Sequence, residues 1–138
     1  MNNNELIKKI HTYVNTRLYK DGCVSIADIL MDLGCLKKEK YEDWRFGKVD
    51  YLERVCTCNL HELSLICKEI REYCLGLGCK GSYTVYKRWG SRNRSDKRLL
   101  RFSKSGSADI EKAYATHYVD IKRVKQLKEK NASVDTEI

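Results

Sequence analysis

The longest helical repeat of this 138-residue chain runs from Leu52 to Leu77, and it constrains the fold more than any other feature. Its positions advance by alternating steps of four and three residues, which places them on one face of a helix. They are Leu52, Cys56, Asn59, Leu63, Ile66, Ile70, Tyr73 and Leu77. With Asp50 as the cap and Glu53 in the capping-box position, the spacing predicts one helix from Asp50 to about Leu75. The run 59–62 offers an alternative, because Asn59 and Glu62 could cap a second helix.

Shorter helices are expected before this repeat. Residues 4–19 carry apolar side chains at helical spacing, and Gly22 follows as a stop. Ser25 caps a second, short helix that ends before Gly34. Residues 36–49 show no clean period, so we interpret them as a loop.

Strand patterns follow the glycines at 76, 78 and 81. Residues 82–89 alternate, with Tyr83, Val85 and Trp89 on one face, and residues 98–104 form a second alternating run. The polar residues 90–97 lie between them, which predicts a β-hairpin with a long basic tip. A final helix is expected from about Ala108, capped by Ser107, to about Lys130.

These elements predict an α+β, mainly helical protein with a single domain at 1–130 and a flexible tail at 131–138. Over residues 4–104 the element order resembles a winged helix, with three helices plus a β-hairpin, and one C-terminal helix is added. The helix predicted at 50–75 has five acidic and three basic residues, which disfavours its insertion between DNA phosphates. We interpret it as a core or homodimer element.

Three further blocks carry a second resemblance. "YEDWRFGKVDYLERV", "LRFSKSG" and "YATHYV" are similar to an uncharacterised family of small bacterial proteins. The resemblance implies a bacterial cytosolic origin and assigns no functional residue. No signal peptide or membrane span is recognisable in the sequence, so we expect a cytoplasmic protein without a membrane partner.

Positive charge is concentrated in one stretch. The net charge is +8, and residues 86–106 alone hold eight basic residues and one acid. Clustered charge of this kind produces a local field that attracts polyanions. The sequence therefore predicts a non-catalytic protein that binds DNA or RNA phosphates through Arg88, Arg92, Arg94, Lys97, Arg98, Arg101 and Lys104. Lys122, Arg123 and Lys125 could assist. A solvated, solubilising loop is the alternative.

Two further features of this stretch have paired interpretations. Trp89 and Phe102 could stack on exposed bases or could fill the core. The turn Ser103-Lys104-Ser105-Gly106-Ser107 leads into a helix N-terminus and could bind an anion, whereas Ser107 could simply cap the helix.

Other functional classes stay open. An enzyme acting on a phosphorylated or nucleic-acid substrate could use this turn with His117 or with Glu42 and Asp43. A protein-interaction module with an acidic partner is a third hypothesis. We assign no catalytic residue, cofactor or metal. The seven cysteines lack zinc-site spacing, and we expect reduced, buried thiols.

Overall fold

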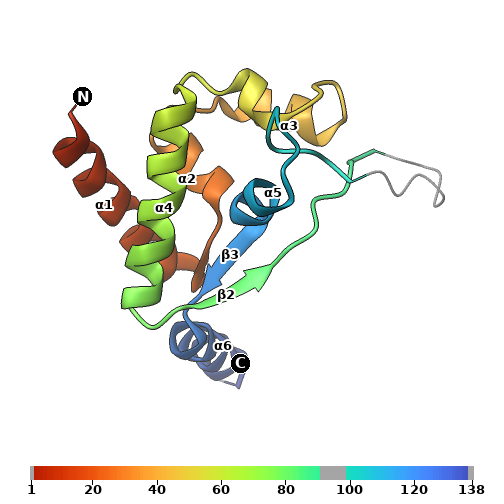
Figure 1. Cartoon of the computed structure of the whole chain (residues 1–138). Coiled ribbons are helices and arrows are strands. Elements are labelled where there is room, and N and C mark those ends of the chain that lie inside the picture. The colour runs from red at the N-terminus through yellow and green to blue at the C-terminus, as the bar shows by residue number, and fades with distance from the viewer. Residues whose placement is uncertain (1, 91–98, 137–138) are drawn as a thin grey trace.

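A computed structural model describes residues 2–90 and 99–136 of the chain. It is a mixed α+β, mainly helical structure with a small antiparallel sheet (Figure 1). The elements in chain order are α1 Asn3–Asp21, β1 Cys23–Val24, α2 Ile26–Asp32, α3 Lys38–Arg45, the 3-10 helix η1 Leu52–Val55, α4 Leu60–Gly76, β2 Lys80–Tyr83, α5 Ala108–Ala115, β3 Thr116–Val119 and α6 Ile121–Thr136. No helix among the described residues has the length and apolar character needed to cross a bilayer.

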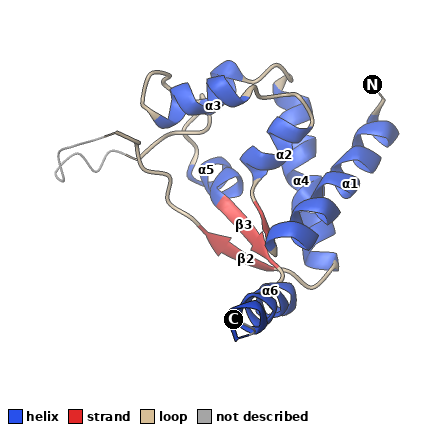
Figure 2. Ribbon diagram, turned by 180° about the vertical axis from the view of Figure 1, so that it is seen from behind, coloured by secondary structure: helices blue, strands red, loops and turns tan. Residues whose placement is uncertain are grey.

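The three strands are arranged in the order β1–β3–β2, so the last strand in the chain is the central one. Val24 pairs with Tyr118, and Gly81 pairs with the same residue from the other side. Helices α1 and α4 lie side by side, whereas α3 and α6 lie at opposite ends of the molecule (Figures 1 and 2). This separation matters below, because each end carries its own basic residues.

Apolar stripes on α1 and α4 form one part of the core. Each stripe follows the helical steps of three and four, so its side chains share one face and enter the interface between the helices. The buried residues are Leu6, Ile10, Val14 and Leu18 on α1 and Leu63, Ile66, Ile70 and Cys74 on α4. The stripe on α4 is thus covered by its own chain.

The predicted helix from Asp50 to Leu75 is wrong, and the alternative break at Asn59 is confirmed. The Asn59 side chain accepts from the Glu62 N–H at 2.8 Å, and the Asn59 N–H donates to the Glu62 carboxylate at 3.4 Å. This capping box starts α4. Upstream, the N–H groups of Leu52 and Glu53 donate to the carbonyls of Arg101 and Phe102, so η1 is held by a distant segment.

The loop predicted for residues 36–49 is also wrong in part, because Lys38–Arg45 forms α3. Only Trp44 of this helix is buried, and it is fully buried. Its indole N–H donates to the Arg101 carbonyl at 2.8 Å. A helix that buries a single side chain has no repeating apolar period, which explains why the pattern was not recognisable.

The predicted hairpin is corrected as well. Lys80–Tyr83 pairs with β3. The backbones of the described arms of the hairpin pair only at the Lys87–Leu99 bridge and at a bond from the Leu100 N–H to the Tyr86 carbonyl. Tyr83, Val85 and Trp89 are exposed, whereas Tyr86 is buried. The predicted tip lies outside the described residues, apart from Gly90.

The single C-terminal helix is wrong too, because β3 divides it into α5 and α6. Thr116-His117-Tyr118-Val119 is rich in β-branched and aromatic residues, which favour an extended strand. The Asp120 carboxylate then accepts from the Arg123 N–H at 3.1 Å and starts α6. Helix α6 continues to Thr136, beyond the predicted end near Lys130.

The expectation of reduced thiols is wrong for one pair. The Sγ atoms of Cys35 and Cys58 form a disulfide, 2.14 Å apart, which ties the segment after α2 to the segment before α4. Cys23, Cys56, Cys67, Cys74 and Cys79 are free, but the first three are only partly buried, so the expectation of burial is wrong for them. Cys74 and Cys79 are buried, and burial raises the pKa of the Cys74 thiol to about 12.

Candidate nucleic-acid interface

The first arm of the basic stretch is fastened to the end of α3. The Arg88 Nε donates to the Phe46 carbonyl at 3.1 Å, and the Trp89 N–H donates to the Arg45 carbonyl at 2.7 Å. Gly47 lies under this crossing with φ +77°, and a Cβ on Gly47 would be 2.8 Å from Arg88 Nε. Glycine at this position therefore lets the arginine side chain cross the turn.

The second arm is anchored through its backbone. The Arg101 carbonyl accepts both the Trp44 indole N–H and the Leu52 N–H. Its guanidinium group lies 5.4 Å from the centroid of the Tyr51 ring, within cation–π range. The buried tryptophan thus fixes the position from which the Arg101 side chain extends.

Both arginines border one hollow. A cavity of about 420 Å³ is lined by Arg88 and Arg101 and by Tyr51 and Asp50. Asp50 also forms an exposed ion pair with Arg54 at 3.3 Å. The structure therefore brings together two of the predicted phosphate-binding arginines, one from each arm, beside an aromatic ring.

Two exposed aromatic residues are chain neighbours of residues that line this cavity, since Phe46 precedes Gly47 and Trp89 follows Arg88. Phe46 is 41% exposed and Trp89 is 39% exposed, and their rings meet edge to face at 5.6 Å. The Arg45 guanidinium lies between Trp89 and Tyr86, 4.6 and 4.9 Å from their ring centroids. Because large aromatic rings on a surface beside cations can stack on bases, Trp89 suits the role considered for it.

Phe102 has the other role. It is 3% exposed, stacks on Tyr114 at 5.5 Å and lies 4.9 Å from the Trp44 ring. The core interpretation of Phe102 is therefore confirmed.

The remaining predicted phosphate contacts divide into three groups. Arg92, Arg94, Lys97 and Arg98 lie outside the described residues. Lys104 is exposed on a separate groove between α4 and α5. The basic residues of α6 lie at the end of the molecule opposite α3 (Figure 2). There the Arg123 Nε donates to the Tyr19 carbonyl at 2.8 Å.

Four of the five backbone N–H groups of the candidate anion turn, which runs from Ser103 to Ser107, donate to side chains of the chain itself. The N–H groups of Phe102 and Ser103 donate to the Glu111 carboxylate at 2.8 and 2.7 Å, and the Lys104 N–H donates to Glu53 at 2.9 Å. The Gly106 N–H donates to the Ser103 hydroxyl, and the Ser107 N–H donates to the Ser105 hydroxyl. Ser107 precedes α5 but makes no side-chain cap bond, so the predicted Ser107 cap is wrong. Bound anions would have to displace these internal partners.

The residues considered for catalysis are not assembled. His117 Nε2 lies 2.7 Å from the Tyr86 hydroxyl. The pKa of His117 is lowered overall, because the effect of burial exceeds the opposite effect of the Asp28 carboxylate. Within the described ranges, no hydrogen bond or ion pair joins His117 to Glu42 or Asp43. No cluster of three or more histidine, cysteine or acidic side chains suited to a metal occurs within them either.

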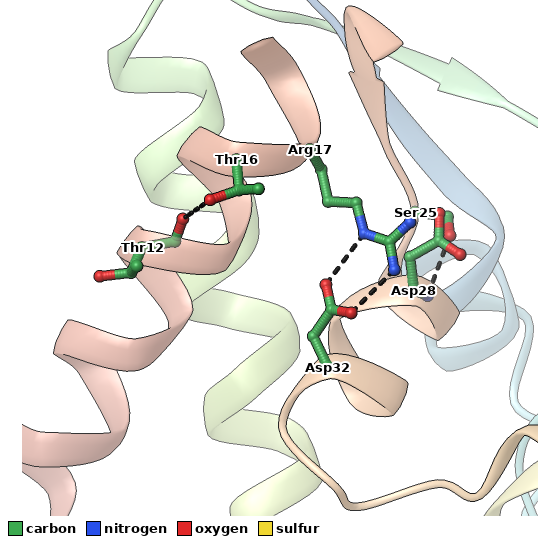
Figure 3. A network of polar contacts seen from close by, with 6 residues as sticks. All are labelled: Thr12, Thr16, Arg17, Ser25, Asp28 and Asp32. Carbon is green, nitrogen blue, oxygen red and sulfur yellow. Dashed lines mark hydrogen bonds and ion pairs between the residues drawn. The ribbon is translucent and has the colours of Figure 1, made fainter. Parts of the chain in front are cut away.

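One partly buried ion pair was not predicted from the sequence. Arg17 on α1 donates twice to the Asp32 carboxylate on α2, at 2.9 and 2.8 Å, and this bond raises the pKa of Arg17 (Figure 3). The Ser25 cap beside it, which accepts the Asp28 N–H at 3.1 Å, is confirmed. The ion pair joins residues 15 positions apart on two helices, so no local pattern marks it.

Comparison with known proteins assigns this chain to no family. The chain matches no family model, and neither a curated protein nor a solved structure matches it significantly. The site must therefore be interpreted from its own residues.

Proposed function

We propose that this protein binds DNA or RNA without catalysing a reaction, through the basic arm, which we define as residues 86–104. The observation that carries the proposal is the pairing of Arg88 and Arg101 around one cavity, next to the exposed rings of Phe46 and Trp89. Arginine suits phosphate because its planar fork can donate two hydrogen bonds at once. Both arms lead into residues 91–98, which hold four further cations.

The fold supports this proposal at the level of resemblance. The order β1–β3–β2, with helices before and between the strands, is compatible with a winged helix whose wing is the insertion from 84 to 115. The contacts proposed here belong to this insertion. We do not assign base recognition, because phosphate contacts position a protein without reading sequence. We also do not propose a dimer through α4, whose apolar stripe is buried within the chain.

The experiment is a fluorescence-anisotropy titration of labelled DNA and RNA oligonucleotides at several salt concentrations. Each phosphate that the arm neutralises should add about 0.7 to 0.9 to the slope of log affinity against log salt. Charge reversal of Arg92, Arg94 and Lys97 to glutamate should abolish binding and leave the thermal unfolding curve intact.

The matched control reverses Lys122, Arg123 and Lys125 to glutamate, which changes the net charge equally at the opposite end of the molecule. Binding should survive in this variant. Equal loss in both variants would show that net charge alone governs binding, and the proposed interface would be wrong. Absence of salt-dependent binding in the unmodified protein would remove the function itself.

A further inference from the structure

A groove of about 710 Å³ lies between α4 and α5, apart from the cavity bordered by Arg88 and Arg101. Five parts of the chain enclose it: η1, α4, residues 104–105, α5 and β3. Walls from this many elements make a concave site of the volume typical for small molecules, roughly 300 to 1,000 Å³.

Helix periodicity explains why α4 borders this groove. One stripe of α4, from Leu63 to Cys74, is buried in the core. The neighbouring stripe faces the groove and consists of Leu60, Ser64, Cys67, Lys68 and Arg71. These residues are spaced by helical steps, so they form a row from Leu60 to Arg71 about 16 Å long. The groove is therefore elongated along the helix.

The groove offers apolar surface on both walls. Leu60 on α4 is 60% exposed, and Ile110 on α5 is 42% exposed with Ala113 one turn further along. Tyr114 and Tyr118, both buried, also line it. Binding of an apolar ligand over these side chains is favourable, because it removes exposed apolar surface from water.

Charge is distributed unevenly around this apolar surface. Lys68 and Arg71 lie on the α4 wall, and Lys104 borders the groove as a third cation. None of the three forms an ion pair with a carboxylate in the described part of the chain.

The groove also contains two acids, which differ in their bonding. Glu53 accepts the Lys104 N–H at 2.9 Å and the Tyr114 hydroxyl at 2.7 Å, so its two oxygens are already engaged. Asp109 lies on the opposite wall, on α5. The α4 wall is thus the cationic side of the groove.

From this arrangement we infer that the groove binds a small amphipathic anion, of the class of a medium-chain aliphatic carboxylate. The alkyl chain covers Leu60, Ile110 and Ala113, and the carboxylate meets Lys68 and Arg71. Charge-assisted hydrogen bonds from these two side chains provide the preference for an anion. This inference does not depend on nucleic-acid binding.

Isothermal titration calorimetry of the full chain tests the ligand class with three probes of equal chain length: decanoate, decanol and decyltrimethylammonium. Decanoate should bind saturably at one site, and each of the other two should bind at least about tenfold more weakly, a difference of about 1.4 kcal/mol. Equal binding of decanoate and decanol would overturn the anionic part of the inference. Preference for the ammonium probe, or no binding of decanoate, would overturn it entirely.

Variants locate the site. Ala113→Trp fills the groove and should abolish decanoate binding, whereas Ala108→Trp, an exposed alanine of the same helix outside the groove lining, should not. Ala113→Leu is the second groove variant if the larger side chain lowers the melting temperature. Lys68→Gln with Arg71→Gln should weaken decanoate about tenfold and leave decanol unchanged. Undiminished decanoate binding in both Ala113 variants would place the ligand elsewhere and refute the site.

Discussion

The guanidinium group of Arg45 lies 4.6 Å from the centroid of the Trp89 ring, and the Arg45 carbonyl accepts the Trp89 N–H at 2.7 Å. These two contacts hold Trp89, which belongs to the basic arm, on the last residue of α3. Trp89 remains 39% exposed, although the rings of Tyr41 and Phe46 also meet its ring edge to face, at 6.0 and 5.6 Å. These contacts orient the indole and leave part of the side chain accessible to solvent.

Trp89 should therefore act as a stacking platform if the arm binds single-stranded nucleic acid. Base stacking contributes about 1–3 kcal/mol per base, so Trp89→Ala should weaken binding at least about fivefold. Tyr19→Ala is the matched control, because Arg123 covers that exposed ring at 4.3 Å at the opposite end of the molecule. Anisotropy titrations measure both variants. Equal affinities of Trp89→Ala and the unmodified protein would refute the platform.

The turn at Gly47 should couple the position of Arg88 to nucleic-acid binding. Gly47→Ala places a Cβ 2.8 Å from Arg88 Nε and should break the bond from Arg88 to the Phe46 carbonyl. Gly34 has a similar φ of +80°, but a Cβ added there would have no atom within 4 Å, so Gly34→Ala is the matched control. Both variants should lose about 1–2 kcal/mol of stability from the left-handed backbone. Only Gly47→Ala should lose affinity; an equal loss in Gly34→Ala would contradict this.

The Cys35–Cys58 disulfide should stabilise the fold by restricting the unfolded chain. A loop with a sequence separation of 23 corresponds to about 3 kcal/mol in the chain-entropy model. Cys35→Ala with Cys58→Ala should lower the free energy of unfolding by about this amount, as measured by urea denaturation. Cys23→Ala removes a free thiol as the control. A reducing agent should lower the free energy of unfolding of the unmodified protein and leave that of the double variant unchanged. Any other result would argue against the disulfide.

Stability should fall in mild acid because of His117. Its folded-state pKa is lowered mainly by burial, so the unfolded chain binds more protons near the ordinary histidine pKa of about 6.5. Unfolding is then favoured as the pH falls through this value, and the contribution is fully present above it. His117→Gln should reduce the drop in melting temperature between about pH 8 and pH 5. His61→Gln, at an exposed position, should not; identical pH profiles of His117→Gln and the unmodified protein would disprove the effect.

Local patterns predicted the elements whose stabilising contacts are close in sequence. The helix at 4–19 and the Ser25 cap were found because their partners lie within four residues. The break at Asn59 was visible as an alternative for the same reason. The disulfide and β3 were missed because their partners are distant: Cys35 bonds Cys58, and Thr116 pairs with Tyr83.

The site shows the same division. Charge counting selected Arg88 and Arg101, since composition alone reveals a basic stretch. It did not select Tyr51 or Phe46, which contact these arginines only because the turn after α3 brings them there. The one sequence signal for Phe46 was that it is an apolar residue beside a glycine, Gly47, in a segment with no helical or strand period.

The strand order has a consequence for synthesis. The central strand β3 is the only described partner of both β1 and β2, yet it follows them in the chain by more than thirty residues. In nascent chains that have emerged only as far as Gly106, α1 can pack on α4, but β1 and β2 lack the strand with which both form hydrogen bonds. Completion of the sheet therefore awaits the emergence of Thr116–Val119, and premature termination before Thr116 should yield aggregating fragments.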